Sequence, residues 1–75
     1  MFNSLSFSEL EALYSKLSDE SQKYYSLCQY LERLYYDNPS VPVLVKHEAR
    51  MYRLMHKETE LLITYILDAM LQVEL

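Results

Sequence analysis

Hydrophobic residues recur with a seven-residue period in two long runs that are separated by one break. In the first run the hydrophobic positions are Leu10, Leu13, Leu17, Tyr24, Leu27, Leu31 and Leu34. This spacing places them on one stripe of an α-helix, the a and d positions of a heptad, where the only polar residue is Glu20. The pattern predicts an amphipathic helix over about 7–36.

The start of this helix carries its own local signal. Ser6 and Glu9 have the spacing of a capping box, and Leu5 and Leu10 flank it at the spacing of a hydrophobic staple. The polar stretch 18–22 resembles a second cap, but the hydrophobic phase is the same before and after it. We therefore expect one helix that continues through this stretch.

The segment 37–42, Asp-Asn-Pro-Ser-Val-Pro, is the strongest interruption in the chain. Pro39 disfavours the α conformation at Asn38 and so ends the first helix. Ser40 can cap the next helix, and Pro42 is tolerated in a first turn. Two helices of similar length joined by so short a turn lie antiparallel. The predicted fold is all-α, a single-domain helical hairpin over residues 1–75.

The second run predicts a helix over about 43–72 with a broad hydrophobic surface. Its stripe contains Val45, Ala49, Tyr52, Met55, Thr59, Leu62, Ile63, Ile66, Ala69, Met70 and Val73. Near its end, four more hydrophobic residues lie off this stripe: Leu61, Tyr65, Leu67 and Leu71. One partner helix cannot cover both sets. We expect self-association through these four residues into a homodimeric four-helix bundle, or docking of this end into another protein.

Composition argues against catalysis. The chain has 75 residues, no glycine and 51% hydrophobic residues, which suits one small ordered domain and leaves no glycine-based phosphate loop. His47 and His56 match no metal-binding motif, and His56 with Glu60 could hold a metal only weakly. The single Cys28 suits a buried, inert thiol. We expect no enzyme, no cofactor and no metal site.

The chain carries no signal for export or membrane insertion. Residues 1–6 lack the basic and apolar regions of a secretory leader. The longest apolar-rich stretch, 61–73, is shorter than the roughly 20 residues that a membrane span needs. A lone cysteine fits a reducing compartment. We expect a cytoplasmic protein that does not enter a membrane.

The basic residues form one pattern on a chain with a net charge of −4. Lys46, Arg50, Arg53 and Lys57 share one face of the second predicted helix. They could contact phosphates or an acidic protein, or they could form a solvated face paired with nearby acids. The acidic balance favours the solvated face and argues against general nucleic-acid binding.

Tyrosines supply a second set of candidates. The chain has eight tyrosines, and Tyr25 and Tyr36 point outward in the predicted register. An exposed tyrosine suits a binding interface as well as it suits packing at the rim of a thin bundle. Tyr25 and Tyr36 are therefore predicted partner-binding residues.

The final residues, Gln72-Val73-Glu74-Leu75, resemble the start of the Gln-Leu-x-Leu-Phe peptides that dock on bacterial sliding clamps, without the final aromatic. In size, acidity, tyrosine content and absence of glycine, the chain resembles small phage-encoded host-takeover proteins, and it is similar in general character to the sliding-clamp inhibitors. This resemblance implies a non-catalytic inhibitor that occludes a host DNA-binding protein. It also implies that acids such as Glu11, Asp19 and Glu20 bind the partner, taking the place of DNA.

Two other functions remain open from the sequence. One is a small nucleic-acid-binding regulator that uses the face from Lys46 to Lys57. The other is a structural assembly subunit whose second helix packs into a larger complex.

Overall fold

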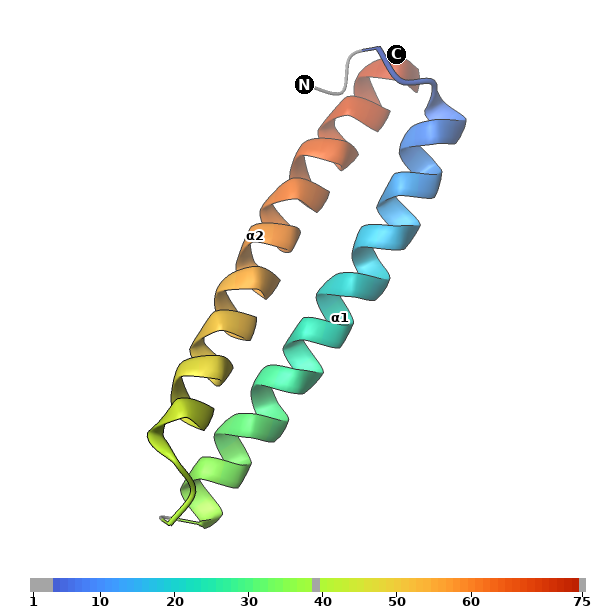
Figure 1. Ribbon diagram of the computed structural model, residues 1–75. Coiled ribbons are helices and arrows are strands. Elements are labelled where there is room, and N and C mark those ends of the chain that lie inside the picture. The colour runs from blue at the N-terminus through green and yellow to red at the C-terminus, as the bar shows by residue number, and fades with distance from the viewer. Residues whose placement is uncertain (1–3, 39, 75) are drawn as a thin grey trace.

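Two antiparallel helices make up the computed structural model, which describes residues 4–38 and 40–74. Helix α1 comprises Phe7–Asp37 and helix α2 comprises Val43–Glu74. Figure 1 shows them side by side, with the first turn of α1 and the last turn of α2 at the same end. The predicted all-α hairpin is confirmed, and so is the continuous helix through 18–22.

The capping box at the start of α1 is formed as predicted. The Glu9 backbone N–H donates to the Ser6 hydroxyl at 3.2 Å, and the Ser6 N–H donates to the Glu9 carboxylate at 3.3 Å. Leu5 packs against the core cluster that contains Leu10, as a hydrophobic staple does. These contacts set the angle at which the chain enters α1.

The turn ends α1 and begins α2 where expected, but Ser40 does not cap α2. Asn38 is extended (φ −132°, ψ 90°), and its N–H donates to the Leu34 carbonyl at 3.1 Å. Helix α2 begins at Val43, directly after Pro42, so the prediction that Ser40 caps it is wrong. Pro39 lies outside the described residues.

The hydrophobic core is concentrated at the end of the hairpin away from the turn. Leu10 and Ile66 are fully buried there, and Ala69 joins them. Partly buried residues pack around this cluster: Leu5, Leu13, Tyr14, Leu17 and Met70. Towards the turn, the buried positions on the two helices carry only small side chains: Ser21, Cys28, Ala49 and Thr59.

The face of α1 that contacts α2 differs from the predicted stripe by one heptad column. Ser21 and Cys28 are 2% and 4% exposed, whereas Leu13, Leu27 and Leu34 are only half-buried. Each of these leucines is followed directly by a residue that contacts α2: Tyr14, Cys28 and Tyr35. The a and e columns therefore face α2, and the d column lies at the side.

Helix α2 differs from its predicted stripe in the same way. Met55 and Leu62, which the predicted stripe contains, are each 36% exposed, and Val73 is also exposed. His56 takes the interhelical position instead and hydrogen-bonds to Ser21. A helix that packs on one neighbour uses two adjacent columns of side chains, so a third hydrophobic column stays at the side.

The hairpin is long and thin. It measures 54 × 16 × 13 Å, with a radius of gyration of 16.3 Å. A compact domain of this length has a radius of roughly 11 Å. Its accessible surface is 5831 Å², against roughly 4,900 Å² for a typical folded monomer of 9.0 kDa. The chain therefore exposes more surface than an ordinary domain of its size.

Candidate functional site

The two long sides of the hairpin differ in chemistry. On one side, α1 and α2 meet through polar pairs: Tyr25 with His56, and Glu32 with Arg53. Leu27 follows Tyr25 by two residues, and Met55 follows Arg53 by two, which is about 200° around each helix. Both therefore lie on the opposite side, so the hairpin has one apolar and one polar side.

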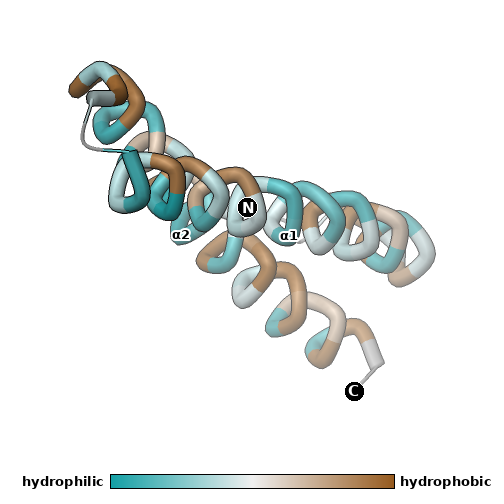
Figure 2. Tube along the Cα trace, turned by 90° about the horizontal axis from the view of Figure 1, so that it is seen from below, coloured by the Kyte–Doolittle hydropathy of each residue, from teal (hydrophilic) through white to brown (hydrophobic). Residues whose placement is uncertain are grey.

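The apolar face consists of side chains from both helices: Leu13, Leu27, Leu34, Met51, Met55 and Leu62. Its leucines on α1 are half-buried, and its α2 members are exposed. Glu20 interrupts the column on α1 and is half-buried, and Glu48 interrupts the column on α2. Figure 2 shows hydrophobic residues on successive turns of α2 towards its C-terminal end.

The structure does not bring the four predicted self-association residues together. All four are exposed: Leu61, Tyr65, Leu67 and Leu71. Leu67 lies six residues after Leu61, about 240° further around α2, so the pairs Leu61–Tyr65 and Leu67–Leu71 lie on different sides. Only Tyr65 borders the apolar face. The predicted stripes contain five of the six residues of that face, all except Met51, and therefore place these five between the two helices. The third column of each heptad is the signal that could have identified them.

The opposite side carries three adjoining hollows that share lining residues, and we call them together the polar groove. It runs from the turn to the middle of the hairpin and is lined by Tyr25, Glu32, Tyr36, Arg50, Arg53, Lys57 and neighbouring residues. Its floor holds the small side chains Ser21, Cys28 and Ala49. Small floor residues leave space between the helices, which is why this side is concave.

A buried serine anchors the middle of the polar groove. The Ser21 hydroxyl donates to Glu60 Oε1 at 2.6 Å. His56 Nδ1 lies 3.0 Å from that hydroxyl oxygen and 3.1 Å from the Ser21 carbonyl oxygen. Because the hydroxyl proton goes to Glu60 and a carbonyl only accepts, His56 Nδ1 must carry a proton. His56 Nδ1 therefore does not serve as a base towards Ser21, and the cluster is an interhelical clamp.

Removal of the Ser21 hydroxyl should weaken the hairpin. We expect Ser21→Ala to lower the free energy of unfolding by about 1–2 kcal/mol, because His56 and Glu60 lose a part-buried partner. Chemical denaturation followed by circular dichroism, at one protein concentration, measures the change. Ser26→Ala, at an exposed position of the same helix, is the matched control, and equal losses in both variants would contradict the clamp.

Cys28 is buried beside the ion pair of the polar groove. Its thiol donates to Glu32 Oε1 at 3.3 Å, and Glu32 also pairs with Arg53. Burial is the largest effect and raises the pKa of the Cys28 thiol; Arg53 opposes this rise and Glu32 adds to it. A buried thiol with a raised pKa is a poor nucleophile. This agrees with the inert thiol that the sequence predicted.

The raised pKa of Cys28 makes stability depend on pH in a defined window. The folded chain holds the thiol proton more tightly than the unfolded chain does. The stabilising contribution is therefore complete below the ordinary thiol pKa, about 8.5, and is lost as the pH rises through the raised value. We expect wild type to lose stability over this window faster than Cys28→Ser, by denaturation at several pH values. Parallel curves would show that burial of the thiol has no such effect.

The four predicted basic residues line the α2 wall of the polar groove. Arg53 pairs with Glu32, and the Lys46 ammonium lies 5.5 Å from the centre of the Tyr35 ring. Arg50 and Lys57 form no ion pair with any residue in the described part of the chain. Half of this basic face is therefore engaged within the hairpin.

The predicted partner-binding residues are dispersed around α1. Glu11, Tyr25 and Tyr36 lie on the side of the polar groove by helical position, and the two tyrosines are exposed. Asp19 is exposed on the outer surface, while Glu20 is half-buried at the apolar face. These five residues do not form one surface.

The remaining sequence expectations concern metals and membranes. Within residues 4–38 and 40–74, no three histidine, cysteine or acidic side chains gather as metal ligands would. Neither helix is long and apolar enough, over its described residues, to cross a membrane.

Comparisons with known proteins identify no relative. No family model matches the chain, and neither the curated proteins nor the solved structures contain a match. The resemblance to sliding-clamp inhibitors therefore stays a prediction.

Proposed function

We propose that this chain is a non-catalytic interaction module whose working form is a homodimeric four-helix bundle. Two hairpins would pack their apolar faces against each other, and the bundle would bind another macromolecule through its outer surfaces. The observation that carries the proposal is the apolar face, whose side chains the hairpin leaves half-buried on α1 and exposed on α2. Helices with three hydrophobic columns are typical of bundles in which each helix packs on two neighbours.

The exposed area supports this assembly. The hairpin exposes about 900 Å² more than a typical monomer of its mass. A standard interface buries about 800 Å² on each partner. The shortage of buried residues gives a second reason, because chains of this length rarely stabilise themselves through one small core. A second copy would supply the missing burial.

Charge complementarity favours a particular pairing. Tyr24 and Tyr52 stack across the helices with ring centroids 6.3 Å apart. Lys16 precedes Tyr24 and Glu58 follows Tyr52, so both lie on the same side of this pair along the hairpin, within about 3 Å of the same height. They occupy the two outer edges of the apolar face. A two-fold axis parallel to the helices sets α1 of one copy against α2 of the other. Lys16 of each copy then meets Glu58 of the other, and all neighbouring helices are antiparallel.

Sedimentation equilibrium over a hundredfold range of concentration tests the proposal. We expect a mass of twice the 9.0 kDa of one chain, with a loss of helical signal on dilution as the dimer dissociates. A fully helical species of one chain mass at every concentration would refute it.

Occlusion of a host DNA-binding protein by the acids of α1 remains a prediction from the resemblance. It needs a target, and the dispersed positions of Glu11, Asp19 and Glu20 supply no common surface for it.

A further inference from the structure

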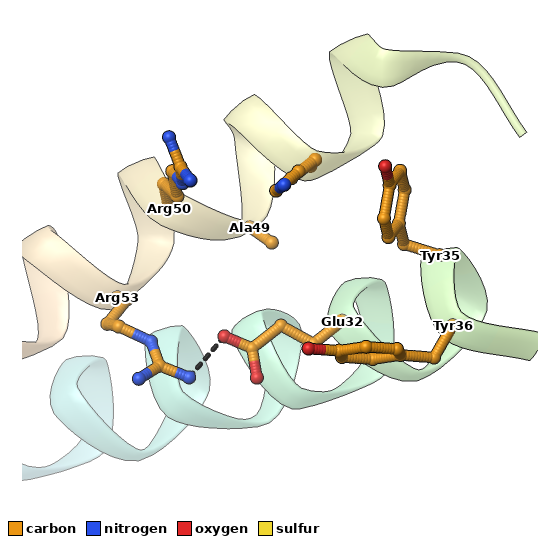
Figure 3. Close-up of a pocket in the computed structure, with 7 residues that line it drawn as sticks. Glu32, Tyr35, Tyr36, Ala49, Arg50 and Arg53 are labelled. Carbon is orange, nitrogen blue, oxygen red and sulfur yellow. Dashed lines mark hydrogen bonds and ion pairs between the residues drawn. The ribbon is translucent and has the colours of Figure 1, made fainter.

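The polar groove combines two walls of different chemistry. The α1 wall presents tyrosines, and the α2 wall presents lysines and arginines. Figure 3 shows the turn end, where Tyr35 and Tyr36 project from α1 and Arg50 and Arg53 from α2. We propose that this groove binds single-stranded nucleic acid, with phosphates along the α2 wall and bases stacked on the tyrosines of α1.

The charge of the groove suits an anion although the whole chain is acidic. At the turn end, a hollow of about 410 Å³ is lined by Lys46, Arg50, Arg53 and only one acid, Glu32. Glu32 is paired with Arg53. Arg50 and, further along, Lys57 are left without an ionic partner within the described chain, so both are available to phosphates.

The exposed tyrosine rings favour nucleic acid over an acidic peptide. Tyr36 is 81% exposed and Tyr25 is 48% exposed. Cations alone would recognise a carboxylate-rich peptide and would give these rings no role. A basic track beside aromatic faces is the arrangement that binds single strands, because every base has a face that can stack.

The dimensions match a short strand. Lys46 and Lys57 are eleven residues apart in α2, which spans roughly 16 Å. A stacked strand rises about 3.4 Å per nucleotide, so this wall follows about five nucleotides. The groove lies opposite the apolar face and is present in one hairpin, so the proposal does not depend on the dimer.

Fluorescence anisotropy with a labelled oligothymidine of about ten nucleotides, at low salt, tests the proposal. Two matched pairs of variants separate the groove from general charge and aromatic effects. Arg50→Ala is compared with Arg33→Ala, at an exposed position on the outer surface of α1, and Tyr36→Ala with Tyr30→Ala, which lies away from the groove. All four positions are exposed, and circular dichroism and sedimentation verify that fold and mass are kept.

We expect Arg50→Ala and Tyr36→Ala each to weaken binding by about fivefold or more. Arg50→Ala should also reduce the slope of log affinity against log salt by about 0.7. Both control variants should change affinity less than twofold. Absence of binding by wild type, equal losses in the controls, or equal competition by a glutamate-rich peptide of the same charge would each overturn the proposal. Equal competition by free thymidine monophosphate would overturn the assignment to a strand.

Discussion

Glutamate in place of Leu62 is expected to convert the proposed dimer into monomers. Leu62 lies in the middle of the apolar face and is 36% exposed in the hairpin, so a single chain can tolerate the change. In a two-fold dimer the substitution buries two unpaired carboxylates, one from each copy. Each buried unpaired charge costs about 3–5 kcal/mol, so two of them should raise the dissociation constant about ten-thousandfold or more. Sedimentation velocity measures this change.

Leu54→Glu is the matched control for this prediction. Leu54 is on the same helix and is 57% exposed, but its helical position places it on the outer surface, away from the apolar face. The same change of residue there should leave the mass of the proposed dimer unaltered. Dissociation of both variants, or of neither, would mean that the apolar face is not the dimer contact.

Truncation of Ile66 should have the largest effect on folding. Ile66 is fully buried against Leu10, and these are the two fully buried large side chains among the described residues. Ile66→Ala removes three carbons from this contact, and such changes cost about 2–5 kcal/mol. Since a small domain has only a few kcal/mol of net stability, we expect most of the chain to unfold, as circular dichroism would show.

The control for Ile66 is a truncation at an exposed site of the same helix. Leu71 is 61% exposed, so Leu71→Ala should change the free energy of unfolding by less than about 1 kcal/mol. If Ile66→Ala retained the helical signal and melting temperature of Leu71→Ala, the core would not lie where the structure places it.

Local signals made the hairpin predictable from the sequence. The capping box of Ser6 and Glu9, the constant hydrophobic phase across 18–22 and the effect of Pro39 on Asn38 each act over a few residues. The structure contains the first two, and Asn38 is extended as expected. Such features do not depend on which surface a helix buries.

The choice of interhelical columns was not predictable in the same way. Periodicity identifies a and d positions, but Ser21 and His56 are polar and carry no hydrophobic signal. They face each other because the Ser21 hydroxyl, His56 and Glu60 satisfy one another across the interface. That advantage appears only when both helices are paired in register, so it cannot be seen in either run alone.

The polar groove could not be predicted from the sequence for the same reason. From the sequence we predicted that the four basic residues share one face of α2. Tyr25 and Tyr36 were predicted separately, as exposed residues of α1. Antiparallel pairing brings these tyrosines opposite the basic residues, and the relation depends on register between residues far apart in the chain.

Isotope-filtered nuclear Overhauser spectroscopy shows directly whether two copies of the hairpin pack through their apolar faces. In a mixture of ¹³C-labelled and unlabelled chains, only contacts between copies give filtered signals. We expect such signals from the methyl groups of Leu27, Met55 and Leu62. Signals confined to Leu67 and Leu71, or a complete absence of signals between copies, would contradict a dimer built on the apolar face.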